Sequence, residues 1–233
     1  MRTIGCILFA LFALLAGMSA AWAATFTILP DGGGDFPTIQ AGIDAIDDGD
    51  VLELGAGTFT GDGNRDIDFL GKAIVVRSQT GSPETCILDC QGSVAEPHRG
   101  FHFRSGEGTG SVLDGVTITG GWAGDGARGA GIRCENASGP IISNCVLSQN
   151  RGAAALCIDH GHLQCQDCVF EHNAALEGGG VCCEEATLTL TGCRFLQNTA
   201  DMLGGAVHAH ATTIEIVDCE FDQNSAAHGG ATD

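Results

Sequence analysis

Positive charge is scarce in this sequence. Its 233 residues include 10 Lys and Arg against 29 Asp and Glu, which gives a formal net charge of -19 at pH 7. Nucleic acids and anionic lipid surfaces are bound mainly through Lys and Arg side chains. We therefore expect no nucleic-acid partner and no binding to anionic membrane surfaces.

Long apolar runs, tyrosine and a collagen-like repeat are also lacking. After residue 23 no stretch reaches the roughly 18 apolar residues of a membrane-spanning helix, so we expect no transmembrane segment in the mature chain. The 36 Gly do not recur at every third position, which excludes a collagen, and a hydrophobic fraction of 44% excludes a disordered acidic chain. So much Gly indicates many turns or close backbone approaches.

The first 23 residues have the pattern of a secretory signal peptide. Arg2 supplies the positive end, residues 7–15 the apolar segment, and Ala21-Trp22-Ala23 a small-x-small cleavage site. We expect a mature chain that begins at Ala24 and is exported to the extracellular space or a bacterial outer surface. It keeps 11 of the 12 Cys, an odd number that leaves at least one thiol free or bonded to another chain.

A repeat with a period of 23 to 26 residues runs through the second half of the chain. Each copy has a Cys, a Leu or Phe two residues later and an Asn five residues later. The Cys and Asn columns are Cys145, Cys168, Cys193 and Cys219, and Asn150, Asn173, Asn198 and Asn224. Residues 112–121 align without a gap to residues 141–150 and place Val116 and Ile118 in the Cys and Leu columns. The repeat therefore continues upstream.

The apolar residues within one copy alternate with polar ones in short runs, such as Val181 and Cys183, Leu188 and Leu190, and Cys193 and Phe195. A period of two predicts strands, and three short strands separated by turns predict a triangular coil. Stacked coils pair each strand in parallel with its equivalent in the next copy. The sequence thus predicts an all-β fold, a right-handed parallel β-helix, with the Gly tracts at 178–180, 204–205 and 229–230 at a sharp corner.

Two motifs carry a resemblance to known families. GGGV at 178–181, GGAV at 204–207 and a truncated GGAT at 229–232, each following an FxxN motif, resemble the repeats of the chlamydial polymorphic outer membrane proteins. Similar units occur in secreted β-helix proteins of the pectin-lyase-like superfamily. Residues 31–61 are similar to the N-terminal opening of pectin-lyase-like chains, including pectin methylesterases. The resemblance implies a solenoid fold and an exported protein.

The segment before the coil predicts a cap. Ile39, Ile43 and Ile46 lie at i, i+4 and i+7 of a short helix beginning near Pro37, and its apolar face would cover the first rung. We expect a signal peptide at 1–23, an N-terminal cap at 24–50 and a parallel β-helix at 51–233. Further strands are expected within 69–79 and 85–92. We also expect the β-helix to continue past Asp233 in a longer protein or to be covered there by a partner chain.

Cysteines fall on both faces of the predicted strands. Those of the repeat column point inward, where a free Cys acts as a small apolar residue, and Cys165 and Cys168 are read as buried too, because they lack the context of a redox motif. Cys157, Cys182 and His208 instead occupy the outward position of consecutive copies. One hypothesis is a Cys157–Cys182 disulfide, since parallel neighbours lie about 4.8 Å apart. The other is a soft metal site that also uses Asp159, His160, His162, Glu184 or His210.

We assign no catalytic, cofactor-binding or metal-binding residue. Residues 62–66 match the first ligand positions of a calcium loop, but Ile67 and Ala73 stand where Gly and Glu are required, so calcium lacks a complete motif. Hydrolysis of a glycosidic bond needs two converging carboxylates. The acidic pair at 47–48 lies in the predicted cap, and the pair at 184–185 would point to opposite faces.

These observations favour an exported, non-catalytic β-helix that presents a surface for carbohydrate or cell-surface protein, as an adhesin-like module. Two alternatives stay open: a polysaccharide lyase or hydrolase of the pectin-lyase-like superfamily, and a passive structural stalk. Lys72 is the single lysine of the mature chain, and no catalytic set of that superfamily is recognisable. A fold by itself assigns no activity. The Asn column is expected to hold each corner through stacked side-chain amides.

Overall fold

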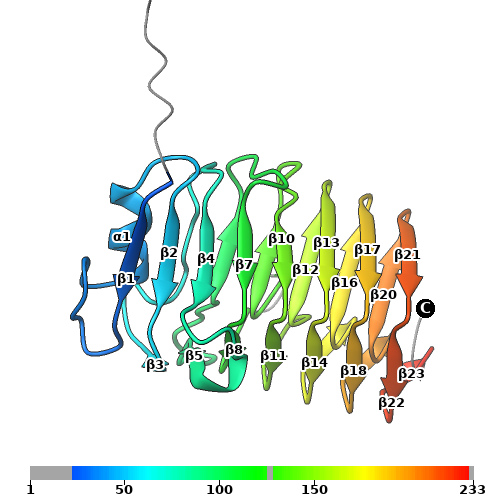
Figure 1. Cartoon of the computed structure of the whole chain (residues 1–233). Helices are drawn as coiled ribbons and strands as arrows, with labels where there is room; N and C mark the ends of the chain where they lie inside the picture. The colour runs from blue at the N-terminus through cyan, green and yellow to red at the C-terminus, as the bar shows by residue number, and fades with distance from the viewer. Residues whose placement is uncertain (1–22, 125–127, 231–233) are drawn as a thin grey trace, which may run out of the picture.

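The computed structural model describes residues 23–124 and 128–230, so the predicted signal peptide lies almost wholly outside the described residues. Figure 1 shows a solenoid of parallel strands that stack from β1 at one end to β21 at the other. Sheet A is the longest and contains β1 (Thr25–Ile28), β2 (Val51–Leu54), β4 (Val75–Ser78), β7 (Val112–Asp114), β10 (Ile141–Ser143), β13 (His162–Gln166), β17 (Thr187–Thr191) and β21 (Thr213–Val217).

Two further sheets complete the coil. Sheet B contains β3 (Gly57–Phe59), β5 (Cys86–Asp89), β8 (Thr117–Thr119), β11 (Val146–Ser148), β14 (Val169–Glu171), β18 (Arg194–Leu196) and β22 (Glu220–Asp222). Sheet C contains β6 (Phe101–Phe103), β9 (Ile132–Cys134), β12 (Leu156–Asp159), β16 (Val181–Glu184) and β20 (Val207–His210). The predicted all-β parallel solenoid is confirmed, as are the strands expected within 69–79 and 85–92.

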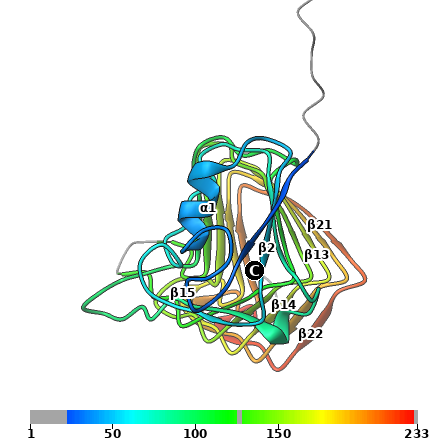
Figure 2. The ribbon, with the colours of Figure 1, turned by 60° about the vertical axis from the view of Figure 1, so that its left-hand side comes forward.

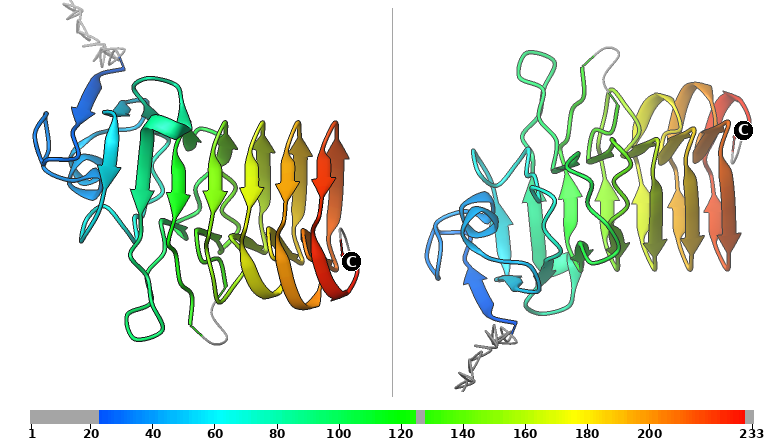
Figure 3. Two further views of the ribbon diagram at one scale, coloured as in Figure 1. Left: turned by 90° about the horizontal axis from the view of Figure 1, so that it is seen from below. Right: turned by 90° about the horizontal axis from the view of Figure 1, so that it is seen from above.

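The pairing register confirms the alignment of the repeats. Leu113 pairs with Ile142 in sheet A, and Ile118 pairs with Leu147 in sheet B. These are the partners that the ungapped match between residues 112–121 and 141–150 predicts. Figure 3 shows the stacked rungs from two sides, with longer loops, in green, projecting from the coil.

The prediction of three strands per copy is wrong for the last three rungs, which have a fourth. Sheet D consists of β15 (Ala174–Glu177), β19 (Thr199–Leu203) and β23 (Ser225–His228). This segment between the Asn column and the Gly corner was expected to turn, but it is extended and pairs in parallel from rung to rung. Its register shifts between Ala175 and Glu177, a β-bulge that breaks the alternation by which strands are recognised.

One short helix, α1 (Ile39–Ala45), lies over the first rung (Figure 2). The hydroxyl of Thr38 caps it by accepting a hydrogen bond from the Ala41 amide at 3.2 Å. Pro37 therefore precedes the cap instead of opening the first turn, and Ile46 is the C-cap residue, although it is buried as expected. A single-turn 3₁₀ helix spans Pro83–Thr85. Over the described ranges no helix is long and apolar enough to cross a membrane.

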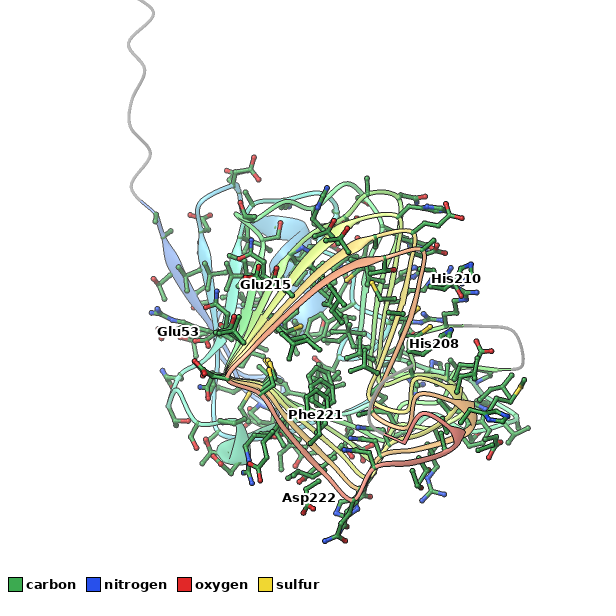
Figure 4. The ribbon with its side chains drawn as sticks, turned by 90° about the vertical axis from the view of Figure 1, so that its right-hand side faces the viewer. Glu53, His208, His210, Glu215, Phe221 and Asp222 are labelled. Atoms are coloured by element: carbon green, nitrogen blue, oxygen red, sulfur yellow. The ribbon has the colours of Figure 1, made fainter. Side chains whose placement is uncertain are left out.

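The core is a continuous column of apolar side chains along the axis. The rings of Phe170, Phe195 and Phe221 stack on consecutive rungs with centroids 4.7 and 4.9 Å apart. Figure 4 shows Phe221 inside the coil, whereas Glu215 and Asp222 point outward. Beside the rings, the repeat cysteines donate their thiols to backbone carbonyls of the preceding rung. The inward-facing cysteines are therefore packed in the core as free thiols, as predicted.

Candidate ligand-binding groove

A groove of about 710 Å³ runs beside sheet C, where the chain passes from sheet D to the Gly corner. It is lined by Trp122, Arg128, Arg151, Gly152, Ala153, Ala154, Ala174, Ala175, Leu176, Glu177, Cys182 and Asp201. Five of the lining residues are Gly or Ala, and the others include one aromatic and four charged side chains. Cavities of this size accommodate small organic ligands or one or two sugar residues.

Trp122 is held in place by two neighbouring segments. Its amide donates to the carbonyl of His98 at 2.8 Å, and it forms a parallel bridge with Arg151. Its ring lies close to Gly152, where an added Cβ would come within 3.3 Å of the indole. The indole is only half-buried, so its free surface is available to a ligand in the groove.

The bulges of sheet D expose apolar side chains beside the groove. Leu176 lines it and is 54% exposed, and Met202, in the next rung, is 48% exposed. Both belong to the irregular stretch where β15 and β19 shift register. The bulges therefore expose apolar side chains that a regular strand would bury. The exposed Leu176 lines the same groove as Trp122.

Positive charge gathers at this groove although the protein has little of it. Arg128 and Arg151 line the cavity, and the half-buried Arg99 donates to the Arg128 carbonyl at 2.8 Å. Burial, and then the nearby charge of Arg133, lowers the pKa of the Arg99 guanidinium. Arg128 forms an ion pair with Glu184. The groove thus presents guanidinium groups within a strongly acidic molecule.

A column of polar side chains crosses the outer face of sheet C. His102, Arg133, Cys157, Cys182 and His208 are direct register partners on successive strands. The predicted alignment of the last three is confirmed. Figure 4 shows His208 and His210 on this face. The last three members of the column are nevertheless buried, with Cys157 at 0%, Cys182 at 5% and His208 at 9% exposure, whereas His102 and Arg133 are half-buried.

Two polar atoms of this column are buried without a hydrogen-bond partner in the described part of the chain: Nε of Arg133 and Nδ1 of His208. The Nε2 atom of His208 lies 3.9 Å from the carboxylate of Glu177, which lines the groove. Buried polar atoms are costly unless they are bonded. His208 is therefore a candidate contact for a polar ligand.

The glutamates on this face are each paired with a basic side chain. Glu135 accepts from His102 Nε2 at 2.7 Å and lies 2.6 Å from Arg133 Nη2. Glu184 is paired with Arg128, whereas Glu185 faces His160 at 3.3 Å. The adjacent glutamates therefore have separate partners and do not converge.

The acidic pair in the predicted cap is also structural. Asp48 accepts from the Ala73 amide at 2.8 Å, and the Asp47 amide donates to Asp50 at 3.0 Å. These contacts link the cap to the next rung. Neither carboxylate belongs to the groove.

The column with two cysteines and a histidine is not arranged for a metal ion. Within residues 23–124 and 128–230 no group of three or more Cys, His, Asp and Glu side chains has metal-binding geometry. Of the neighbours considered as ligands, His162 lies on β13 in sheet A, away from the column, and His160 occupies a left-handed turn with φ 54°.

The calcium-like loop at 62–66 has structural partners instead of a ligand set. Asp62 pairs with Arg65 at 2.8 Å, and the Asn64 side chain accepts from the first amide of α1, at Ile39, at 3.0 Å. Asp66 accepts from the Arg99 amide at 3.0 Å. The loop therefore fastens the helix and the following rungs.

Sequence reasoning missed the groove. Trp122, Arg128 and Arg151 belong to no motif, and Leu176 lies in the segment expected to turn. A signal was present in the composition, because only two Trp and ten basic residues occur in the chain and several of them meet here. Their convergence depends on loops that the repeat does not specify.

Comparison with known proteins identifies the fold family. The model of a family described as right handed beta helix region matches residues 54–226. Among solved structures, a pectin methylesterase from Aspergillus niger is similar at 11% identity and a TM-score of 0.44, over 86% of this chain and 85% of that one. A mannuronic acid specific polysaccharide family 6 lyase from human gut microbiota is similar at 12% identity and a TM-score of 0.38; the match covers 82% of this chain and 59% of the lyase. No curated protein matches the sequence. Because the family match extends over most of its length, this chain belongs to the right-handed β-helix family.

Proposed function

We propose that this protein binds carbohydrate in the groove beside sheet C and does not cleave it. The observation that carries the proposal is the meeting of a half-buried Trp122 with Arg128, Arg151, Glu177 and Asp201 around one cavity of about 710 Å³. An indole stacks on the C–H face of a sugar ring, and guanidinium and carboxylate groups bond its hydroxyls in pairs. Few ligand classes need both kinds of surface together.

A polysaccharide lyase or hydrolase is the alternative. Cleavage requires carboxylates or bases free to act on the substrate. Glu184 is instead held by Arg128, and Glu135 by His102 and Arg133. These pairings leave neither Glu184 nor Glu135 free to act as an acid or a base.

The proposal extends to the organisation of the whole chain. Residues 1–23 act as a signal peptide, residues 24–50 cap the coil and residues 51–233 form the displayed β-helix, at a cell surface or outside the cell. The FxxN and GGAV repeats support an adhesin-like role similar to that of the polymorphic outer membrane proteins. A cell-surface protein is the alternative ligand, and a passive stalk would have none.

Binding to a panel of neutral and acidic oligosaccharides, measured by glycan array and then by calorimetry with and without calcium, tests this function. We expect Trp122→Ala and Arg151→Ala each to weaken binding at least about tenfold, the value of one good contact. Arg194→Ala is the matched control, because Arg194 pairs with Glu220 on sheet B. Absence of any glycan ligand, or equal binding by all variants, would refute the proposal. New unsaturated or reducing ends would establish the enzymatic alternative.

A further inference from the structure

Two thiols lie side by side next to the groove: Cys182 lines it, and Cys157 is fully buried beside Cys182. Cys157 on β12 and Cys182 on β16 are direct register partners on neighbouring parallel strands. Such partners lie about 4.8 Å apart, within the Cα separation of about 4.4–6.8 Å that a disulfide spans. Their side chains lie on the same outer face of sheet C and pack against each other in one small cluster.

This pair differs from the cysteines of the inner column. The thiols of Cys168 and Cys193 donate to the carbonyls of Ile142 and Cys165 at 3.4 and 3.5 Å and are enclosed by the core. Cys157 and Cys182 instead form a small separate cluster with Ala154, outside the coil. Cys182 also lines the groove, which gives a solvent-borne reagent a path to its sulfur.

The surroundings make the two thiols unequal. Cys182 lines the groove, whereas Cys157 is fully buried beside it. Contact with Cys157 and then the charge of Arg128 lower the pKa of the Cys182 thiol, and a thiolate is the reactive form of cysteine. Because it is accessible from the groove, Cys182 is the thiol that reacts first, and Cys157 lies where a resolving thiol is needed.

We propose that Cys157 and Cys182 are a redox-active pair that closes to a rung-to-rung disulfide at the edge of the groove, with a small-molecule disulfide as oxidant. The Cys182 thiolate attacks one sulfur of the oxidant, forms a mixed disulfide and releases one thiolate. Cys157 then loses its proton and attacks Cys182 Sγ, which releases the second thiolate. Two protein thiols are oxidised to one disulfide, the oxidant is reduced to two thiols, and the two cysteine protons end on these products.

The disulfide would link residues 25 positions apart on adjacent rungs. Closing such a loop reduces the freedom of the unfolded chain, so the oxidised protein should be the more stable form. The bond would also hold strands β12 and β16 together next to the cavity. This inference concerns the thiols themselves and is independent of whether the groove binds carbohydrate.

Equilibration of the purified, folded protein with oxidised or reduced glutathione tests the proposal. We expect oxidation to remove two free thiols per chain, to raise Tm by about 5–10 °C and to yield a Cys157–Cys182 peptide on mapping without reduction. Cys182→Ser should abolish all three changes. Cys219→Ser is the control, because it removes a partly exposed thiol of the inner column and leaves the pair intact.

Peptide mapping of the wild-type protein decides the question even if Cys182→Ser does not fold. Both residues recovered as free thiols after oxidation would refute the proposal. A disulfide between two other cysteines would refute it equally.

Discussion

Four asparagine side chains bond consecutive rungs along one corner of the coil. The carbonyl oxygen of the Asn173 side chain accepts from the amide of Asn150 at 2.9 Å, and its Nδ2 donates to the Leu147 carbonyl at 2.8 Å. Asn198 repeats both contacts one rung later. The first three side chains of this column are buried, so each of their bonds replaces one that water would make in the unfolded chain.

Asn173→Ala should therefore lower the free energy of unfolding by about 3 kcal/mol, because it leaves buried amide and carbonyl groups unpaired at about 1–3 kcal/mol each. Urea denaturation followed by circular dichroism measures this change. Asn224→Ala is the control: Asn224 makes the same contacts but is half-buried, so water can replace them and the loss should be smaller. Equal losses at the two positions would contradict this account.

His102 should make stability depend on pH. Burial, and then the charge of Arg99, lowers its pKa below the ordinary value, even though Glu135 acts in the opposite direction. The unfolded chain therefore binds this proton more tightly, and the stability that neutral His102 contributes is present above about pH 6.5 and is lost as the pH falls.

The free energy of unfolding of the wild type should therefore decrease between about pH 7 and pH 5, and it should decrease less in His102→Gln. His162→Gln, at an exposed position of β13, should leave the fall unchanged. Urea midpoints across this pH range give the comparison. If the free energy of unfolding of His102→Gln decreased with falling pH as steeply as that of the wild type, carboxylates alone would set the pH dependence.

Glycines at the corner before sheet C allow successive rungs to approach closely. A Cβ on Gly179 would lie 2.4 Å from the Gly205 carbonyl oxygen and 2.5 Å from that of Thr199. Gly178 has φ +60°, a conformation that other residues adopt at a cost. The predicted association of the Gly tracts with a sharp corner is confirmed, and close backbone packing is its main cause.

Gly179→Ala should destabilise the protein by about 2–3 kcal/mol, because backbone atoms on two sides would have to move. Gly108→Ala is the matched control, since an added Cβ there meets nothing within 4 Å. Thermal unfolding should show a clear fall in Tm for the first variant and little change for the second. A similar Tm for both would mean that the corner can relax.

The elements show where prediction from sequence succeeds and where it stops. Columns of Cys, Phe and Asn recur at one spacing, and that repetition specifies register as far as the Leu113 and Ile142 pair. The predicted stacking of the Asn side-chain amides is present, and the left-handed turns lie one residue before the Asn column, for example Gln149 at φ 55°. Sheet D was not predicted, because a β-bulge breaks the alternation of apolar and polar residues in its strands. The groove was not predicted either, because Trp122 and Arg151 meet only through the stacking of loops.

On the scale of the whole molecule, each rung contacts mainly the rungs before and after it. The core is one continuous cluster, yet its strands pair only with their immediate neighbours along each sheet. Stability in such a solenoid is close to a sum of rung and interface contributions. A local defect should therefore have a local effect.

Phe195→Ala should cost about 3–5 kcal/mol and speed amide exchange most in β14, β18 and β22, with little effect on β1 and β2. Phe195 is fully buried between Phe170 and Phe221. Hydrogen exchange followed by mass spectrometry resolves the gradient along the chain. Phe59→Ala, near the other end of the coil, should instead speed amide exchange most in the first rungs. If both variants speeded amide exchange equally along the whole chain, the solenoid would unfold in an all-or-none manner.

The position of Trp122 has an optical consequence. From residue 24 onward the chain contains no tyrosine and no other tryptophan. If the chain is cleaved after residue 23 as predicted, its ultraviolet emission above 300 nm would arise from a single indole, which lines the groove. Wavelength shifts and quenching in such a chain could then be assigned to that one cavity without a dye or label.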